Sequence, residues 1–271
     1  MQNANQLQSE IRFLLGNHPW KEQIYVVDST DSTNSHLKRM AQEGTPHGTC
    51  LIALEQTGGR GRQGRSFSSP AGMGLYFSLL LRPKCAPNQV SHITAMAAVA
   101  ACDAVETVCG TRPGIKWTND LVMNQKKLAG ILTEMDADWG TNSIDHMIIG
   151  IGINLSQKFD DFPEEIQNIA TSIRLATRKE ITCSALAAAL VTRFSQMSSA
   201  LLSEKALWLS RYRQDCITLG KEVKILRGQE SRYAWALDID EDGGLMVRYT
   251  NGETDTVSSG EVSVRGIYGY V

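Results

Sequence analysis

Apolar and polar positions alternate along the chain with two different periods, which predicts a mixture of helices and strands. Apolar residues return every three to four positions at 6–15, 89–109, 182–202 and 203–213, and another helix is expected to begin near Ser32 or Thr33. Short apolar runs typical of strands occupy 24–27, 50–54, 75–81, 115–123, 127–134 and 146–155. Gly110 is a candidate for the end of the helix at 89–109, and Asn124-Gln125 for a turn between two strands.

After Ile217 the pattern changes to short strand-like runs at 222–226, 233–240, 245–249, 254–259 and 263–268. Turn sequences at Asp242-Gly243-Gly244 and Asn251-Gly252 separate some of these runs. We therefore predict an α+β domain, with helices around a mixed β-sheet, over residues 1–215. A small β-barrel domain is expected over residues 216–271.

Composition places the chain among ordinary soluble globular proteins. Its 271 residues are 42% hydrophobic and 21% charged, which excludes intrinsic disorder and collagen-like repeats. The formal net charge is −2, and residues 217–271 carry 9 acidic against 6 basic side chains. This balance argues against a protein whose whole surface binds nucleic acid.

The cysteines and the apolar stretches point to a cytoplasmic protein with reduced thiols. None of the six cysteines forms a C-x-x-C pair and no histidine cluster lies beside them, so we expect core thiols and no structural metal. The first residues lack the basic and apolar regions of a signal peptide. Polar residues interrupt the most apolar stretch, 90–109, which argues against a membrane span.

The segment Gly58–Arg65, GGRGRQGR, is the most unusual in the chain. Its glycines permit close approach of the backbone to a ligand, and its arginines offer forked donors to phosphate or carboxylate. It contains G-x-G-x-x-G, but Pro70 and a strand follow instead of the helix that a dinucleotide fingerprint needs, and no G-K-[ST] is present. The segment is either a solvated hairpin loop or an anion-binding loop that orders around its ligand.

Three further segments carry candidate chemistry. In Lys116–Asp120, KWTND, a lysine, an amide and a carboxylate meet at a strand end, where they could bind phosphate and Mg²⁺ or form only a core tryptophan and a turn. In the strand after Gln125, either Lys126 or Lys127 is expected to face an anion, and strand alternation alone does not choose between them. The two glycines of Gly150–Leu155, GIGINL, predict close approach of a ligand or of another part of the chain.

Five motifs in order resemble biotin protein ligases, also called biotin–acetyl-CoA-carboxylase ligases: DSTN (31–34), EQTGGRGRQGR (55–65), KWTND (116–120), KKLAGILTE (126–134) and GIGINL (150–155). The resemblance covers nearly the whole chain. It implies the family's class II synthetase-like catalytic fold, followed by an SH3-like C-terminal barrel.

The resemblance also assigns roles to positions that match the family's motifs. The biotin site is implied to comprise Ser32, Thr33, Asn34, Gln56, Arg60, Gly61, Arg62, Lys127 and Gly130. The ATP and adenylate site is implied to comprise Arg62, Arg65, Phe67, Lys116, Asn119 and Asn154, with Phe67 beside adenine where the family often has tryptophan. Lys127, Arg62 and Asp120 are the implied catalytic residues, and Asp120 is also the candidate ligand for Mg²⁺. On this basis Lys127, and not Lys126, contacts the carboxylate of biotin.

The implied reaction activates biotin with ATP as biotinyl-5′-AMP and transfers it to a lysine of the biotin carboxyl carrier protein of acetyl-CoA carboxylase. Two departures are Thr118 in place of the proline in K-W-P-N-D and Gln63 in place of an arginine. Only 31 residues precede Ser32, so we expect a monomeric or homodimeric ligase without the DNA-binding domain of repressor-type members and without membrane contact. A lipoate ligase and a non-enzymatic ligand-sensing adaptor remain the alternatives.

Overall fold

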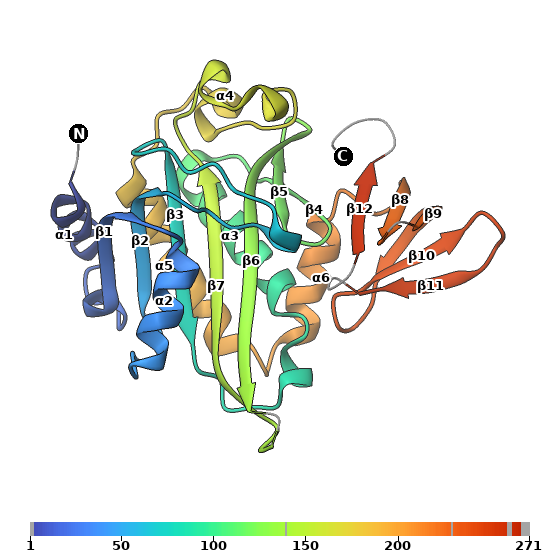
Figure 1. The fold of residues 1–271 in the computed structure, drawn as a ribbon, viewed down its shortest axis with the longest axis horizontal. Coiled ribbons are helices and arrows are strands. Elements are labelled where there is room, and N and C mark those ends of the chain that lie inside the picture. Colours follow the sequence, from blue (N-terminus) through green and yellow to red (C-terminus); the bar gives the residue numbers. More distant parts are fainter. Residues whose placement is uncertain (1–2, 139, 229, 259–261, 267–271) are drawn as a thin grey trace.

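The computed structural model describes residues 3–138, 140–228, 230–258 and 262–266 (Figure 1). Its larger part is a seven-stranded mixed sheet in which the first two strands are parallel and the other neighbours antiparallel. The strands, in spatial order, are β1 (Ile24–Thr30), β2 (Cys50–Gln56), β3 (Gly74–Leu81), β7 (Ser143–Asn154), β6 (Lys126–Asp138), β5 (Asp120–Met123) and β4 (Gly114–Lys116).

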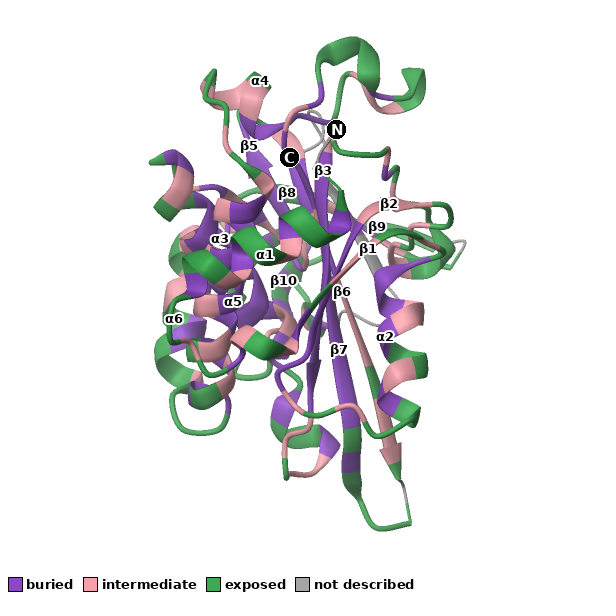
Figure 2. Cartoon of the chain, turned by 90° about the vertical axis from the view of Figure 1, so that its left-hand side faces the viewer, coloured by how far each residue is buried: buried purple, intermediate pink, exposed green. Residues whose placement is uncertain are grey.

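Helices cover both faces of this sheet unequally (Figure 2). One face carries the layer formed by α1 (Ala4–Leu15), α3 (Ile93–Cys109), α5 (Cys183–Ala200) and α6 (Lys205–Asp215). The other face carries α2 (Thr33–Gln42), which packs on β2, β3 and β7. The short α4 (Ile173–Thr177) lies above the ends of the central strands in Figure 1.

The apolar stretch at 90–109 forms the central core helix. By length and composition alone, 87–109 would suffice to cross a membrane, but 72% of its apolar window is buried within the protein. Residues 87–90 form a separate 3₁₀ turn, and Gly110 ends α3 in the left-handed conformation (φ 70°) as predicted. All six cysteines are free thiols, of which Cys85 and Cys183 are only partly buried.

The prediction of a single strand over 115–123 is wrong, because the structure forms the antiparallel pair β4 and β5 there. Trp117 reverses the chain between them. Its backbone N–H donates to Thr218 Oγ1 (2.9 Å) and its indole N–H to the carbonyl oxygen of Gly243 (3.0 Å). Both acceptors lie in the C-terminal part of the chain, so the turn forms through contacts that local sequence does not reveal. The turn predicted at Asn124-Gln125 is confirmed, with φ of 50° and 61°.

The C-terminal part is a five-stranded antiparallel sheet, which confirms the expected small β domain. In spatial order its strands are β11 (Thr254–Val257), β10 (Leu245–Tyr249), β9 (Glu230–Ile239), β8 (Glu222–Arg227) and β12 (Val262–Gly266). Residues 259, 267 and 268 of the predicted runs lie outside the described residues. The sheet joins the larger one where the backbone N–H of Ile217 donates to the carbonyl oxygen of Ile115 (2.9 Å).

Replacing Arg112 by methionine is expected to lower the free energy of unfolding by about 3 kcal/mol, as breaking a buried ion pair does. Arg112 connects α3 to α6, because its guanidinium contacts Asp103 (2.8 Å) and Asp215 (2.6 Å), whose side chains are each 12% exposed. Urea denaturation measures the change. The control is Arg174→Met, whose partner Glu180 is 81% exposed, with an expected loss below about 1 kcal/mol. Equal losses in the two variants would contradict the role given to Arg112.

Candidate active site

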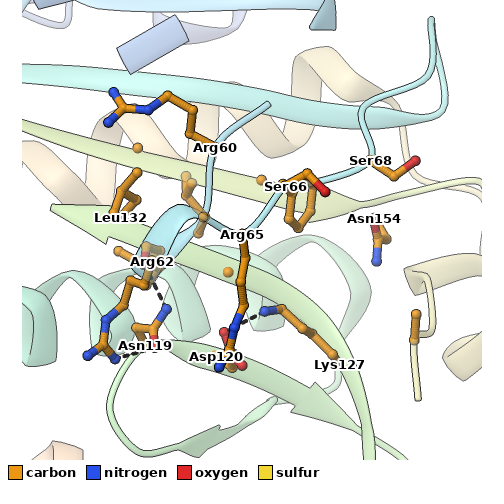
Figure 3. Close-up of a pocket in the computed structure, with 18 of the residues that line it drawn as sticks. Arg60, Arg62, Arg65, Ser66, Ser68, Asn119, Asp120, Lys127, Leu132 and Asn154 are labelled. Atoms are coloured by element: carbon orange, nitrogen blue, oxygen red, sulfur yellow. Dashed lines mark hydrogen bonds and ion pairs between the residues drawn. The ribbon is translucent and has the colours of Figure 1, made fainter. Parts of the chain in front are cut away.

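A cavity of about 690 Å³ lies on the α2 face of the large sheet, within the usual size range of small-molecule sites. Every site residue predicted from the sequence lines it, and Figure 3 labels some of them. These residues are Ser32, Thr33, Asn34, Gln56, Arg60, Gly61, Arg62, Arg65, Phe67, Lys116, Asn119, Asp120, Lys127, Gly130 and Asn154. The structure therefore brings together motifs that are more than a hundred residues apart in the chain.

One end of the cavity is built on the N-terminus of α2. Ser32 precedes the helix but makes no capping hydrogen bond. Gln56 supplies it instead, since its Oε1 accepts from the backbone N–H of Thr33 (2.8 Å) and from the Thr33 hydroxyl (3.1 Å). Because Gln56 comes from the end of β2, this contact sets the position of α2 relative to the sheet.

Asn34 is held by a buried polar network. Its Oδ1 accepts from Ser78 Oγ (2.6 Å), and its Nδ2 donates to the carbonyl oxygen of Leu132 (3.2 Å) and to Glu134 Oε2 (2.8 Å). Ser78 is fully buried on β3 and was not singled out by the sequence, since a serine inside an apolar strand has no distinctive signal. A fixed set of donors and acceptors at this end suits a polar ring system.

Glycines form the floor of the cavity. Gly150 of β7 lies in register with Ser78 and Leu132, and Gly152 lies in register with Gly130. A Cβ atom at Gly150 would lie 2.0 Å from Asn34 Oδ1, and one at Gly152 would lie 2.5 Å from the ring of Phe67. The close approach predicted for GIGINL is therefore confirmed. The neighbours that need the space are the side chains of Asn34, in the DSTN motif, and Phe67, two residues after the arginine-rich loop.

Lys127 faces the cavity because the pairing of β6 with β5 is irregular. Leu121 pairs with Ala129 but Val122 pairs with Lys127, so one extra residue lies in β6. A bulge of this kind reverses the alternation of faces. The Lys127 ammonium therefore lies on the Gly130 side, where a Cβ on Gly130 would be 3.3 Å from it. Lys126 instead places its ammonium over the ring of Phe159 (5.8 Å).

Charged groups gather around Lys127. Its Nζ forms an ion pair with Asp120 Oδ1 (2.8 Å), and Arg62 Nη1 donates to Asn119 Oδ1 (3.0 Å) beside them (Figure 3). Arg65 extends from the loop toward Asp120. Burial lowers the pKa of the Arg62 guanidinium from its usual high value, so an anion bound there would relieve an unfavourable desolvation. This end of the cavity is suited to bind phosphate or carboxylate.

The loop Gly58–Arg65 forms a compact hairpin over the cavity. Gly61 donates its backbone N–H to the carbonyl oxygen of Arg65 (2.7 Å), and Phe67 donates to that of Gly59 (2.9 Å). Gly59 admits no side chain, because a Cβ there would lie 2.3 Å from the Phe67 oxygen. The glycines thus let the arginine-bearing loop pack tightly against the segment that follows it.

The remaining wall comes from residues that the sequence did not single out. Phe162, Ile166, Ile169 and Ala170 follow β7, and Ala170 forms a β-bridge with Lys127. Beside them Asn154 donates to the carbonyl oxygen of Thr171 (3.0 Å) and accepts from Gln157 (3.2 Å). The apolar residues of this wall lie between acidic residues in a segment with no regular hydrophobic period. The sequence pattern alone therefore does not identify them. With Phe67 they form an apolar compartment that suits a flat base.

The C-terminal sheet also reaches the cavity, through Val264 and through the hydrogen bonds to Trp117. The Trp117–Thr118 peptide bond is cis, at the position where Thr118 replaces the family's proline. Tyr212 of α6 donates its hydroxyl to the carbonyl oxygen of Thr118 (3.0 Å). The turn that carries Lys116, Asn119 and Asp120 is therefore fixed from behind.

Replacing Trp117 by phenylalanine is expected to raise the KM for the phosphate-bearing substrate about fivefold, since one net hydrogen bond contributes about 1 kcal/mol. The substitution keeps the buried ring and removes only the indole N–H that donates to Gly243. Steady-state kinetics measure the change. Trp208→Phe is the control, because Trp208 is equally buried on α6 but does not line the cavity. The same KM shift in both variants would contradict this role.

A metal site in the described part of the chain would need a group of side chains that could hold the ion. Asp120 is the carboxylate at the reacting end, and it is already paired with Lys127. Among the described residues, no three His, Cys, Asp or Glu side chains lie close enough together to hold a metal ion.

Comparison with known proteins identifies the family. Residues 26–154 match the Biotin/lipoate A/B protein ligase family and residues 218–265 match the Biotin protein ligase C terminal domain. The chain is 34% identical over 250 residues to the bifunctional ligase/repressor BirA of Bacillus spizizenii, covering 90% of this chain and 75% of the relative. It is 32% identical over 253 residues to the biotin–acetyl-CoA-carboxylase ligase of Mycobacterium tuberculosis, covering 90% and 89%.

The fold agrees with this assignment. The biotin protein ligase from Aquifex aeolicus in complex with biotin and ATP superposes with a TM-score of 0.77 at 30% identity, over 90% of this chain and 98% of that one. The resemblance drawn from five sequence motifs is confirmed, as is the predicted fold class. The chain belongs to the biotin protein ligase family.

Proposed function

We propose that the protein is an ATP-dependent biotin–acetyl-CoA-carboxylase ligase that makes biotinyl-5′-AMP and transfers its biotinyl group to a carrier lysine. One observation carries the proposal. A single cavity joins a polar end around Asn34 to an apolar compartment around Phe67, and Lys127 lies in the cavity beside Asp120. The polar end suits a ring system, Lys127 suits a carboxylate, and the apolar compartment suits the base of a nucleotide.

In the first half-reaction, a carboxylate oxygen of biotin attacks the α-phosphorus of ATP and pyrophosphate leaves. Both reactants are anions, so the site must neutralise them and hold them in line. Lys127, Arg62 and Arg65 supply positive charge at the reacting end. The apolar wall and the loop Gly58–Arg65 exclude water from the mixed anhydride that forms.

In the second half-reaction, the carrier's lysine amine attacks the acyl carbon, an amide bond forms and AMP leaves. A lysine has an ordinary pKa of about 10.4, so it must first lose a proton. Asp120 is our candidate to orient or deprotonate the amine, because it lies 2.8 Å from the Lys127 ammonium. Lys127 then stays near the acyl phosphate as charge develops on the leaving AMP.

We also propose the finer assignments that the sequence suggested. ATP enters as its Mg²⁺ complex, the acceptor is the biotin carboxyl carrier protein, and the enzyme works in the cytoplasm as a monomer or homodimer without binding DNA. The boundary between residues 215 and 216 would separate the catalytic domain from the SH3-like domain. A mobility-shift assay with DNA tests whether the protein binds DNA. Light scattering at several protein concentrations tests whether it is a monomer or a homodimer.

The proposed function is tested by incubating the purified protein with a recombinant carrier domain, ATP, Mg²⁺ and either biotin or lipoate. Mass spectrometry is expected to find one added biotinyl group on one carrier lysine. The control is the carrier with that lysine changed to arginine, which should stay unmodified. Lipoyl addition alone would identify a lipoate ligase, and no addition by folded protein would favour the adaptor.

A further inference from the structure

The three arginines of the loop Gly58–Arg65 point in two directions. Arg62 and Arg65 reach the end of the cavity that holds Asn119, Asp120 and Lys127. Figure 3 shows the guanidinium of Arg60 pointing away from this cluster. Two arginines of the loop therefore lie at the reacting centre, and the third lies elsewhere.

Arg60 is held by Glu134, which lies on β6 near the N-terminus of α2. Arg60 Nη1 contacts Glu134 Oε1 at 3.1 Å and Oε2 at 3.4 Å, and it also donates to Ser35 Oγ (3.4 Å). The Glu134 side chain is 27% exposed and that of Arg60 48% exposed, so solvent only partly screens the pair.

The same carboxylate also holds Asn34. Glu134 Oε2 accepts from Asn34 Nδ2 at 2.8 Å, while Asn34 Oδ1 accepts from buried Ser78. One side chain on the rigid sheet thus contacts both the loop and a residue of the polar end of the cavity. Neither contact reaches the charged groups at Lys127.

We propose that Glu134 is a positioning residue that couples the closed loop to the biotin end of the cavity, an inference that rests on the proposed function for its substrate. It acts through Arg60 and Asn34 and touches neither reacting group. The Glu134 carboxylate holds Asn34 in position to bind the ring system. The same carboxylate holds Arg60, and with it the loop, closed over the cavity. Loss of Glu134 should therefore weaken retention of biotin and its adenylate more than it affects ATP.

The first test needs no ligase activity and so separates this inference from the proposed function. Trypsin cuts after arginine, and the loop carries Arg60, Arg62 and Arg65. Glu134→Gln is expected to speed cleavage within 60–65 about threefold to fivefold in the substrate-free protein, a change that one half-exposed ion pair supports. The control is Glu253→Gln, which removes an exposed ion pair with Arg232 in the C-terminal sheet and should leave loop cleavage unchanged. Unchanged cleavage in Glu134→Gln would overturn the coupling.

The second test uses a double-mutant cycle with Glu134→Gln, Arg60→Gln and both together. Each single variant is expected to raise the KM for biotin and the rate at which the adenylate escapes about threefold to fivefold, with the KM for ATP changed less than twofold. The double variant should be no worse than the more impaired single one, because the two side chains act as a pair. If the effects of the two substitutions multiplied in the double variant, or if the KM values for biotin and ATP rose equally, Glu134 would only support the sheet.

Discussion

Replacing Lys127 by methionine is expected to slow formation of the adenylate by on the order of a hundredfold or more, the usual effect of removing a donor aimed at developing charge. The substitution keeps the aliphatic part of the side chain and removes the ammonium that a bulge in β6 turns toward Gly130 and Asp120. Without it, the carboxylate of biotin and the α-phosphate of ATP repel each other across the cavity. Single-turnover measurement of biotinyl-5′-AMP gives the rate directly.

Lys126→Met is the matched control, because Lys126 is the neighbouring residue and contacts the ring of Phe159. Its adenylation rate should stay within about twofold of the parent rate, since a cation–π contact at such a site contributes only about 0.5–1 kcal/mol and does not touch the reactants. A Lys127→Met variant as fast as the parent, or a Lys126→Met variant as slow as Lys127→Met, would contradict the assignment of Lys127.

Gly150→Ala is expected to raise the KM for biotin, and Gly152→Ala the KM for ATP, each by about tenfold or more. The methyl group at position 150 would lie 2.0 Å from Asn34 Oδ1, so Asn34 must leave its contacts with Ser78 and Glu134 and the biotin KM should rise. The methyl group at position 152 would lie 2.5 Å from the Phe67 ring, so the ring must move and the ATP KM should rise. Overpacking of this kind commonly costs about 1–3 kcal/mol.

The two alanine variants serve as controls for each other, since they add the same group to the same strand two residues apart. Steady-state kinetics with each substrate varied in turn, together with thermal melting, separate binding from stability. Equal rises of both KM values in both variants would mean that the sheet, and not Asn34 or Phe67, has been disturbed.

Much of the fold was predictable because its apolar periods are regular. The longer helices, and the strand runs other than 115–123, follow patterns that depend only on neighbouring residues, whereas the short α4 was not predicted. The reversal at Trp117 was not predictable, because its partners Thr218 and Gly243 lie about a hundred residues further along the chain. The segment 115–123 therefore looked like one strand.

The candidate site likewise contains residues that could be predicted from the sequence and residues that could not. The arginines, Lys127 and the glycines stand out because their types and spacing are unusual for a strand or a turn. Strand alternation left Lys126 and Lys127 both open, and the irregular pairing at Val122 changes which face each residue occupies. Ser78 and Gln157 are ordinary polar residues that become important only when the sheet and the wall enclose them.

The most direct test of the account is ATP–pyrophosphate exchange by the purified protein with Mg²⁺, comparing biotin, lipoate and no added acid. The account predicts exchange that requires biotin and is lost in Lys127→Met but kept in Lys126→Met. Exchange with lipoate alone would contradict the substrate, and no exchange with either acid from well-folded protein would contradict the adenylating reaction itself.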